Sequence, residues 1–444
     1  MTNNNNAVAA CNDQKSKSVE NVRGRLEELC KKRFFYAPAF SIYGGVAGLY
    51  DYGPPGCALQ ANILSLWRSH FIHEENMLEV DCTVMSPHDV LKTSGHVDRF
   101  TDFMVRDVVT GDVYRADHIL EAALEKKVKD EATPADVKRE CEEILAQIDN
   151  YNGQQLDEMI KRFGVRSDAG NPLGTATAFN LMFGTDIGPT GYIKGFLRPE
   201  TAQGQFVNFK RLLECNNDRM PFASAMIGRS FRNEISPRSG LLRVREFTMA
   251  EVEHYVHPER KQHARFHEVA GVSLQFLSAK TQQAGSTDLV TCTIGEAVES
   301  GMVNNQTLGY FLARTAMFLW RIGIDKERLR FRQHMPNEMA HYASDCWDAE
   351  IKNSYGWIEC VGCADRACYD LTMHTKATGE RLVAREKLAE PIKRRVVKFE
   401  CDRKLLGQAF KKDSQAIIKF FDDLTADEAV KLSQAGYPIN VPLA

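Results

Sequence analysis

Hydrophobic side chains recur every three or four residues in several parts of the chain, a spacing that places them on one face of a helix. The clearest such segment runs from about Cys57 to His73. A second runs from about Thr307 to Trp320, and a third helix is expected from about Pro258 to Ala279. In the first of these helices we expect a buried stripe made of Leu59, Ile63, Leu66, Trp67 and Phe71.

The segment from residue 112 to residue 178 has a different, more charged character. Its sequence is typical of helices between about His118 and Asn150. Thr133 is the expected N-cap of one helix, with Pro134 at the first helical position. We interpret residues 112–178 as a helical insertion into the surrounding domain.

Extended segments are expected in five places, without a regular alternation of strands and helices. This pattern predicts an α+β fold in which helices flank an antiparallel sheet. The chain contains neither Gly-x4-Gly-Lys-Ser/Thr nor Gly-x-Gly-x-x-Gly, so no P-loop and no dinucleotide-binding turn are predicted. The expected extended segments are about Gly195–Asn208, Ala223–Phe231, Leu241–His254, Leu329–Gln333 and Trp357–Cys360.

Candidate chemistry concentrates in residues 228–247, which contain five arginines and no lysine. A guanidinium is a planar fork that can hold phosphate through two hydrogen bonds, whereas a lysine offers a point charge. Turn-forming residues at 236–240 divide the segment into two extended arms. We therefore expect a hairpin that binds a polyphosphate. Its arginines are Arg229, Arg232, Arg238, Arg243 and Arg245.

Alternation along the two arms predicts which side chains meet, because residues two apart share a face of a strand. Arg232 and Glu234 should point together on the first arm. On the second arm, one face should run from cations through an aromatic ring to acids. The distance from Phe247 to Glu251 would be about 13 Å, which suits a nucleotide base and an attached amino acid. A solvated, salt-bridged hairpin is the alternative. The residues of the second-arm face are Arg243, Arg245, Phe247, Met249, Glu251 and Glu253.

At these residues the chain resembles a known family. Phe231–Glu234, followed by a loop and an arginine-containing strand, resembles motif 2 of the class II aminoacyl-tRNA synthetases. The closer resemblance is to glycyl-tRNA synthetases of the eukaryotic and archaeal homodimeric type. It extends from about Arg33 to the C-terminus. Its further segments are residues 46–105 for motif 1, Arg198–Gly204 for the glycine pocket and Gly356–Arg366 for an ATP-site strand.

The resemblance implies a class II catalytic core and a reaction in two steps. Glycine and ATP would give glycyl-adenylate and pyrophosphate, and the glycyl group would then pass to the 3′ end of tRNA(Gly). The glycine carboxylate is itself the nucleophile, so such an enzyme must align the reactants and neutralise phosphate charge. ATP would be a substrate, and Mg²⁺ would be the cofactor that binds with it. A homodimer is also implied, with the helix near residues 57–73 in its interface.

The resemblance also implies roles for single residues. Arg232 and Arg243 would be catalytic, holding the α-phosphate and the terminal phosphate. Glu200 and Glu251 would hold the glycine ammonium. The implied ATP-binding residues are Arg232, Asn233, Glu234, Arg243, Val244, Phe247, Glu359 and Cys360. Two structural alternatives are salt bridges between Glu200 and Arg198 and between Arg232 and Glu246.

Other groups of potential metal ligands receive a structural interpretation. Cys360, Cys363 and Cys368 lack a fourth ligand at a familiar spacing, so a zinc site is not expected. A polar cluster is interpreted as structure near the active site, and no metal site is predicted. It consists of His334, Glu338, His341, Asp345 and Asp348.

The order of the segments predicts a domain organisation with two missing parts. Motif 3 of class II synthetases and the anticodon-binding domain of the glycyl enzymes are not found. The alternative function is therefore a truncated, non-catalytic synthetase-like module that binds RNA or a partner. The expected parts are a disordered tail at 1–20, the N-terminal part of the core with motif 1 at 21–111, the helical insertion at 112–178, the core with motif 2 at 179–380 and the start of a further insertion at 381–444.

Composition narrows the choice of partners and location. Among 444 residues, 56 Lys and Arg oppose 59 Asp and Glu, so a nucleic acid must meet a local basic patch. Pro391–Lys412 is one candidate, and its alternative is a solvated helix face. The twelve irregularly spaced cysteines and the lack of an apolar leader favour the reducing cytoplasm. No run of 18 apolar residues exists, and neither a membrane nor DNA is an expected partner.

Overall fold

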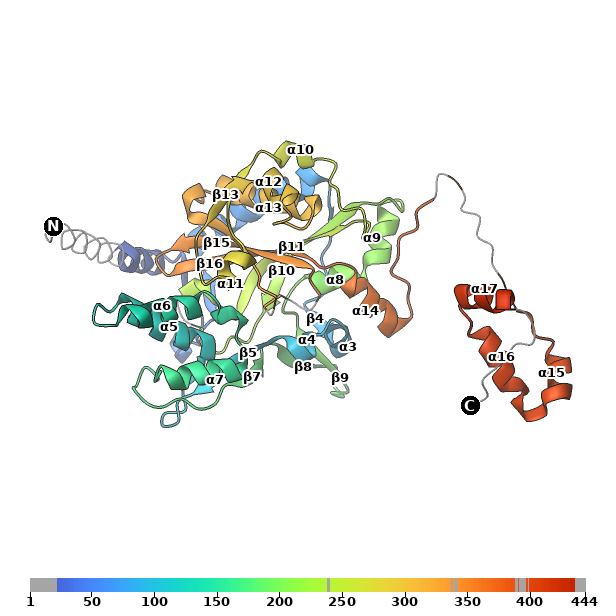
Figure 1. The fold of residues 1–444 in the computed structure, drawn as a ribbon. Coiled ribbons are helices and arrows are strands. Elements are labelled where there is room, and N and C mark those ends of the chain that lie inside the picture. The colour runs from blue at the N-terminus through green and yellow to red at the C-terminus, as the bar shows by residue number, and fades with distance from the viewer. Residues whose placement is uncertain are drawn as a thin grey trace. The chain divides into compact units, whose positions relative to one another are not determined.

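The computed structural model describes residues 22–237, 240–336, 338–339, 342–387, 390, 397 and 399–435. The chain divides into two compact units, Met1–Ala384 and Arg385–Ala444 (Figure 1). The tail expected at 1–20 lies outside the described residues, as do Arg238 and His341. Within the described ranges, every helix is too short or too polar to cross a bilayer.

The first unit is built around a five-stranded sheet in the order β13-β12-β14-β15-β16. Neighbouring strands are antiparallel, except that β12 and β14 are parallel. Helix α13 (Gln306–Arg321), which confirms the helix expected there, packs on this sheet over the fully buried Phe276, Phe331 and Trp347 (Figure 1). The strands are β12 (Ser273–Leu277), β13 (Val290–Thr293), β14 (Leu329–Gln333), β15 (Asp345–Asn353) and β16 (Gly356–Asp365).

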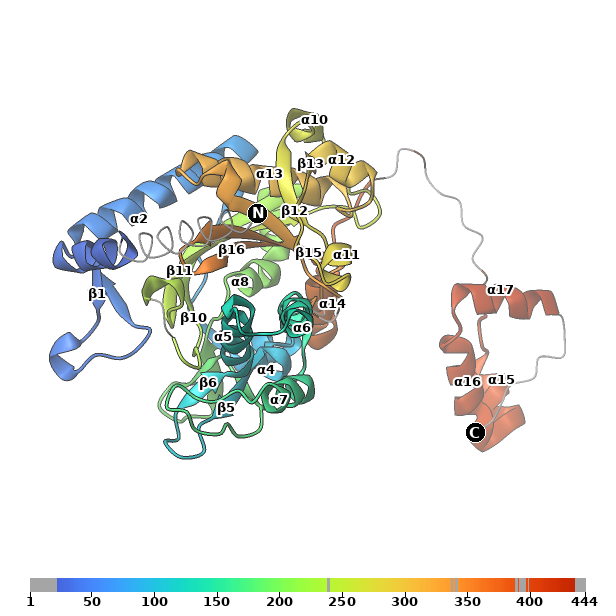
Figure 2. The same ribbon diagram turned by 60° about the vertical axis from the view of Figure 1, so that its left-hand side comes forward.

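A second sheet, in the order β11-β10-β3, carries the arginine-rich hairpin. β10 (Phe222–Phe231) and β11 (Glu246–Tyr255) pair antiparallel along their whole length, and β3 (Leu78–Glu79) lies parallel to β10. The expected hairpin is confirmed, but its second strand starts only at Glu246, after a 3-10 turn at Gly240–Leu242. Figures 1 and 2 place β11 beside β16, so an edge strand of the three-stranded sheet lies next to an edge strand of the five-stranded sheet.

Helix α2 (Pro54–Trp67) continues into a π-helical turn over Arg68–His73 and confirms the helix expected there. The predicted buried stripe is only partly correct, because Phe71 is buried whereas Leu59 is 54% exposed. Before α2, two short strands pair in an arm that stands away from the rest of the unit (Figure 2). They are β1 (Tyr36–Pro38) and β2 (Tyr50–Tyr52).

The charged segment forms a group of helices with a small hydrophobic core of its own. Leu120, Leu124 and Leu156 are buried between these helices and strand β5. Helix α6 starts at Ala135 with Pro134 as its N-cap, so the N-cap expected at Thr133 is wrong by one residue. The elements are β5 (Thr101–Arg106), β6 (Val113–Arg115), α5 (Ala116–Lys129), α6 (Ala135–Leu145), α7 (Gly153–Arg162) and β7 (Thr177–Asn180).

Two expected elements differ from the structure. The helix expected over residues 258–279 is replaced by the short α10 (Phe266–Val269) and by β12, in which buried Leu274 and Phe276 alternate with more exposed residues. The extended segment expected at 195–208 ends at Leu197, and α8 (Ala202–Val207) follows. The other elements are β4 (Met85–Pro87), α3 (His88–Thr93), α4 (His96–Arg99), β8 (Phe183–Ile187), β9 (Ile193–Leu197), α9 (Phe209–Cys215), α11 (Ala279–Gln283), α12 (Ile294–Glu299) and α14 (Tyr369–Thr378).

The described residues of the second unit form three short α-helices, which bury Ile417 and Ala429. The basic segment at 391–412 is only partly described, and within it the side chains of Lys404, Lys411 and Lys412 are exposed. The helices are α15 (Arg403–Phe410), α16 (Ser414–Asp422) and α17 (Ala426–Ala435).

Candidate active site

Arg245 fixes the turn of the β10–β11 hairpin. Its backbone N–H donates to the carbonyl oxygen of Gly48 (2.8 Å), its Nη1 to that of Ala47 (2.5 Å) and its Nη2 to that of Glu234 (2.9 Å). Both Nη atoms of the guanidinium therefore donate to backbone carbonyl oxygens. The expectation that Arg245 shares a phosphate-binding strand face with Arg243 is wrong, because both residues precede the strand and alternation does not apply to them.

Arg232 lies just beyond the end of β10, between two aromatic rings. Its backbone N–H donates to the carbonyl oxygen of Arg245 (3.0 Å), and its Nε donates to the carbonyl oxygen of Pro199 (3.3 Å). The guanidinium carbon lies 5.4 Å from the ring centre of Phe100 and 5.5 Å from that of Phe247. Cation–ring contacts at these distances are attractive. They hold the guanidinium between the two rings.

The residues next to Arg232 have separate roles. Arg229 Nη1 lies 3.5 Å from Glu246 Oε1, so Arg229 and not Arg232 is the arginine that pairs with this carboxylate. The backbone N–H of Asn233 donates to the carbonyl oxygen of Leu181 (2.7 Å). The side chain of Asn233 is half-buried. Val244, also half-buried, lies in the segment that leads into β11.

Glu234 and Arg243 carry buried polar atoms that lack hydrogen bonds. Arg243 Nη1 and Glu234 Oε2 are 3.9 Å apart, and neither atom has a hydrogen-bond partner within the described part of the chain. Burial raises the pKa of Glu234, and the charges of Arg243 and Arg115 oppose this rise. Because an unsatisfied buried donor or acceptor is costly, these atoms have capacity for a ligand.

Glu359 and Cys360 lie on β16, the strand of the five-stranded sheet that is next to β11. Cys360 Sγ donates to the carbonyl oxygen of Ala349 (3.2 Å). Within the described residues, the Glu359 carboxylate makes neither a hydrogen bond nor an ion pair. Desolvation by the surrounding protein and the charge of Asp348 raise the pKa of Glu359 to about 7, while the charge of Arg232 acts in the opposite direction.

Glu200 lies just before α8, and each of its carboxylate oxygens has a neighbour. His96 Nε2 is 3.3 Å from Oε2, and Gln203 Nε2 donates to Oε1 (3.1 Å). Arg366 Nη2 lies 3.9 Å from Oε1. Although burial acts to raise it, the pKa of Glu200 is held well below its usual value by His96 and Arg366. Glu200 is therefore an anion.

Arg198 does not pair with Glu200, and that alternative is wrong. Its Nε donates to the carbonyl oxygen of Arg229 (2.8 Å) and its Nη1 to that of Cys82 (2.6 Å). Gly228 makes room for this side chain, because a Cβ there would lie 2.1 Å from Nη2 of Arg198. Arg198 therefore joins three backbone segments of the fold.

Glu251 lies beside Glu200 on the inner face of β11. Its Oε2 accepts a hydrogen bond from the backbone N–H of Thr201 (2.7 Å) and another from the Thr201 hydroxyl. Burial and the charge of Glu200 raise the pKa of Glu251. Burial also holds the pKa of Glu253, two residues further along, well above its usual value, although Arg366 opposes this. This excess of carboxyl groups over cations suits an ammonium ligand.

Three residues that the motifs did not single out complete this part of the site: His96, Arg366 and Asp370. Arg366 donates to Asp370 through Nε (2.8 Å) and Nη2 (2.9 Å), and Gln203 donates to Asp370 Oδ1 (3.1 Å). His96 and Arg366 lie inside segments that carry the family resemblance, which was a usable signal. Nothing in the sequence distinguishes Asp370 from other aspartates.

Comparison with known proteins identifies the family. Residues 193–305 match the tRNA synthetase class II core domain (G, H, P, S and T). A putative glycine–tRNA ligase of Schizosaccharomyces pombe is 56% identical over 434 residues, which cover 90% of this chain and 67% of that protein. The chain belongs to the glycine–tRNA ligase family.

Two other glycine–tRNA ligases give the same result. Glycine–tRNA ligase 1, mitochondrial, of Saccharomyces cerevisiae is 54% identical over 91% of this chain and 64% of its own length. The putative cytoplasmic glycine–tRNA ligase of Arabidopsis thaliana is 48% identical over 91% of this chain and 87% of its own length. The chain thus spans about two thirds of the yeast relatives. Family membership confirms the predicted class II core with its α+β architecture.

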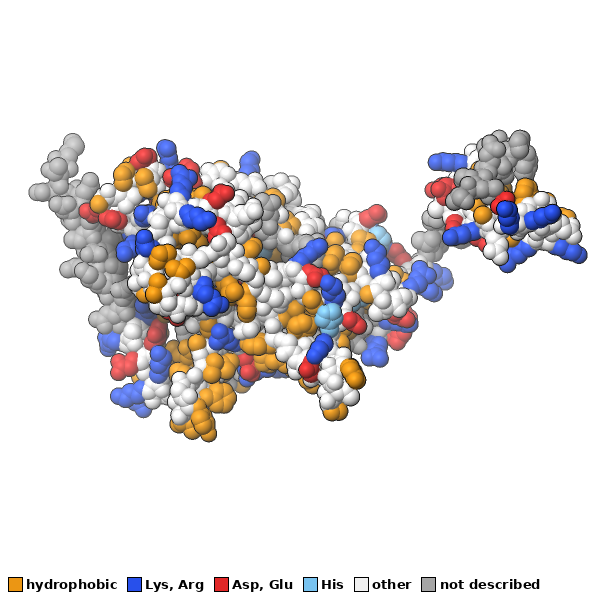
Figure 3. Space-filling model, turned by 90° about the horizontal axis from the view of Figure 1, so that it is seen from below, with side chains coloured by type: hydrophobic (Ala, Val, Ile, Leu, Met, Phe, Trp, Pro, Cys, Tyr) orange, Lys and Arg blue, Asp and Glu red, His pale blue; other side chains and the backbone are white. Residues whose placement is uncertain are grey.

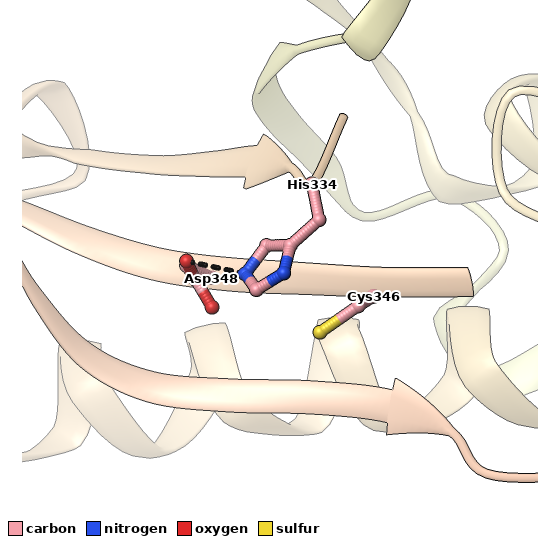
Figure 4. A group of neighbouring side chains, drawn as sticks. All are labelled: His334, Cys346 and Asp348. Atoms are coloured by element: carbon pink, nitrogen blue, oxygen red, sulfur yellow. Dashed lines mark hydrogen bonds and ion pairs between the residues drawn. The ribbon is translucent and has the colours of Figure 1, made fainter. Parts of the chain in front are cut away.

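One polar cluster of the glycine–tRNA ligase core brings potential metal ligands together. Figure 4 shows His334 between Asp348 and Cys346, with donor atoms within 4.8 Å of one another. His334 Nε2 lies 2.8 Å from Asp348 Oδ2, which also accepts from Arg332 Nη2 (3.0 Å). Against the effect of burial, the hydrogen bond to Asp348 and the proximity of Cys346 raise the pKa of His334 to about 11. Asp348 thus pairs with both His334 and Arg332, so these three side chains form one hydrogen-bonded cluster.

Proposed function

We propose that the protein activates glycine with ATP and transfers the glycyl group to the 3′ end of tRNA(Gly), as the names of its relatives indicate. The arrangement along β11 carries the proposal. Arg243, with its unsatisfied Nη1, and Phe247 lie at one end of the strand, and Glu251 lies beside Glu200 further along. Groups for phosphate, base and ammonium therefore follow one another in a line. Among the residues that the structure describes, no comparable arrangement supports the alternative of a non-catalytic module.

Two arginines would act on the triphosphate. Arg232 would hold the α-phosphate and the glycine carboxylate, where charge develops during attack. Arg243 would use its unsatisfied Nη1 on the terminal phosphate. Since preformed donors need no reorganisation, they favour the transition state over free ATP. Glu234 would accept from the adenine amino group and Phe247 would stack on the base, and the other ATP-binding residues would be Asn233, Val244, Glu359 and Cys360.

Glu359 fits the Mg²⁺ that would accompany ATP. Its carboxylate has no partner among the described residues, and because burial and Asp348 raise its pKa, a cation bound beside it would favour the ionised form. Mg²⁺ is commonly held by one or two carboxylates together with phosphate oxygens and water. Glu359 would hold the ion, which supplies neutralisation of phosphate charge when bound.

Glycine offers only an ammonium and a carboxylate for recognition. Glu200, fixed by His96 and Gln203, and Glu251, fixed by Thr201, would accept the ammonium. A methyl group forced into a filled pocket costs about 1–3 kcal/mol, which discriminates about 10- to 200-fold against alanine. Exclusion by the pocket would therefore be one part of the selectivity.

ATP–pyrophosphate exchange tests the proposed activity. Purified protein is incubated with labelled pyrophosphate, ATP and one amino acid at a time. Exchange that depends on glycine, and is weaker with alanine, serine, proline or threonine, is the expected result. Exchange driven best by another amino acid, or none with glycine, contradicts the proposal.

Glycine affinity should fall as the pH falls, because Glu251 must be ionised to pair with an ammonium. Burial and Glu200 raise the pKa of Glu251, with Thr201 and Arg366 opposing. The carboxylate is available above this raised pKa and is lost as the pH falls through it. The KM for glycine, measured at successive pH values below about pH 8, should rise as the pH falls through this raised pKa. Glu251→Gln should flatten this profile, and a flat profile in the unsubstituted protein contradicts the assignment.

A homodimer is part of the proposal, and exposed apolar residues support it. Large apolar side chains are exposed on the β1–β2 arm and on the start of α2, where the arm projects (Figure 2), and hydrophobic side chains gather along the lower edge of Figure 3. Monomers rarely expose large contiguous apolar patches. A second copy of the chain would cover this surface. Its residues are Phe34, Phe40, Ile42, Tyr43, Val46, Tyr52 and Leu59.

Ile42→Asp should weaken the dimer, because Ile42 is 92% exposed and a buried unpaired charge opposes association. We expect the dimer dissociation constant, measured by analytical ultracentrifugation, to rise at least about 30-fold. Ile193→Asp on β9, whose side chain is also exposed, is the matched control. A monomeric unsubstituted protein, or equal effects of both substitutions, contradicts the proposed interface.

The remaining partners follow from the proposed reaction. tRNA(Gly) would be the acceptor in the second step, and neither DNA nor a membrane is proposed. We expect a cytoplasmic location, although the names of the relatives include both cytoplasmic and mitochondrial proteins. Imaging of a fluorescent fusion in cells distinguishes the two.

A further inference from the structure

The guanidinium of Arg366, just after β16, is immobilised beside the carboxylates of the site. Asp370 accepts two hydrogen bonds from it, through Nε (2.8 Å) and Nη2 (2.9 Å). The guanidinium carbon lies 3.7 Å from the ring centre of Tyr342 and 5.1 Å from that of Phe206. A bidentate pair and two ring contacts fix both the position and the plane of this cation.

Arg366 is placed close to Glu200 but just out of hydrogen-bonding range. The shortest ion-pair distance, from Arg366 Nη2 to Glu200 Oε1, is 3.9 Å. The same oxygen accepts a hydrogen bond from Gln203 Nε2 (3.1 Å). The same Gln203 nitrogen donates to Asp370 Oδ1 (3.1 Å), and His374 Nε2 lies 2.9 Å from its amide oxygen. Gln203 thus links the carboxylate of Glu200 to the carboxylate that holds Arg366.

This separation has an electrostatic consequence. The charge of Arg366 acts on Glu200, Glu251 and Glu253, so it favours the ionised form of all three carboxyl groups. A guanidinium in direct contact with Glu200 would occupy the oxygens that an ammonium needs. At 3.9 Å it supports the anion and leaves room for further hydrogen bonds.

We propose that Arg366, held by Asp370, is a positioning residue for amino-acid binding: through its place beside Glu200 and the Asp370–Gln203 link, it keeps Glu200 where it can receive the ammonium group. This inference rests on the proposed function, because it assumes that the ligand at Glu200 is an amino acid. Arg366 itself need not touch the substrate. Its loss should therefore weaken the binding of glycine and leave the binding of ATP unchanged.

The test measures glycine affinity by equilibrium dialysis with labelled glycine, and ATP affinity in parallel. Arg366→Gln should weaken glycine binding by about ten-fold or more, with ATP affinity within about two-fold. Arg366→Lys, which retains the charge, should recover part of the loss. Asp370→Asn should weaken glycine binding in the same direction but less. Arg219→Gln is the control, because Arg219 is an exposed arginine in the turn after α9.

Equal loss of glycine and ATP binding in Arg366→Gln, or glycine affinity equal to that of Arg219→Gln, overturns the inference. If Arg366→Gln does not fold, Asp370→Asn decides, and unchanged glycine affinity in that variant overturns it. If the unsubstituted protein shows glycine-dependent exchange but Arg366→Gln binds glycine normally, the positioning role is contradicted and the proposed function is not. If Arg366→Gln binds glycine more weakly but the unsubstituted protein shows no glycine-dependent exchange, the proposed function is contradicted and the positioning role is not. A protein that binds no glycine contradicts both.

Discussion

Arg232→Ala is expected to lower glycine-dependent ATP–pyrophosphate exchange by about a thousand-fold, the upper part of the range for loss of one donor to developing charge. Arg232 lies between the rings of Phe100 and Phe247 and is anchored to the carbonyl oxygen of Pro199 through Nε. The loss should appear mainly in kcat, because charge on the α-phosphorus oxygens grows in the transition state. Steady-state exchange with varied ATP and glycine measures it.

Arg229→Ala is the matched control on the same hairpin. Its side chain is about half exposed and pairs with Glu246 at 3.5 Å, so it contributes little to stability and has no role in the proposed site. Exchange by this variant should stay within about two-fold of the unsubstituted protein. Similar losses from both substitutions would show that the effect comes from the charge of the hairpin as a whole, and would remove the specific role of Arg232.

Glu200→Gln is expected to raise the KM for glycine by about a hundred-fold and to change the KM for ATP little. The substitution keeps the shape of the side chain but removes the anion between His96 and Arg366. The ammonium then loses its counter-charge, and the cations around position 200 repel it. Initial rates of exchange over a range of glycine concentrations give both constants.

Glu246→Gln provides the comparison for Glu200→Gln. Glu246 is the first residue of β11, and its exposed carboxylate pairs only weakly with Arg229. Its removal should leave the glycine KM within about two-fold. A glycine KM that is unchanged in Glu200→Gln places the ammonium elsewhere. A parallel rise in the ATP KM means instead that the substitution disturbs the whole site.

The hairpin at residues 222–255 was predictable because its signals are local. Turn-forming residues separate two arms, and antiparallel pairing between neighbouring arms needs only a short loop. The structure confirms both strands and their pairing. The second strand begins later than predicted because Arg245 donates hydrogen bonds to backbone carbonyl oxygens of the distant loop at Ala47 and Gly48, and no local pattern encodes such a contact.

The error at residues 258–279 has a different cause. Short apolar runs fit both helical and strand periodicity, so the pattern alone does not decide between them. β12 becomes a strand because it pairs with β13 on one side and with β14 on the other, which lies more than 50 residues further along the chain. The exposed Leu59 is a similar case, since a helical stripe shows that a face is apolar but not what covers it.

The sequence by itself determined the family resemblance, the α+β class, the arginine-rich hairpin and the candidate residues along it, because each depends on residue types at short spacing. Only the tertiary structure decided which charges meet. Glu200 faces His96 and Arg366 from segments about 100 and 170 residues away, while Arg198, two residues from Glu200, turns to backbone carbonyls instead. Electrostatic partners are chosen by distance in space and by burial, and chain order carries neither.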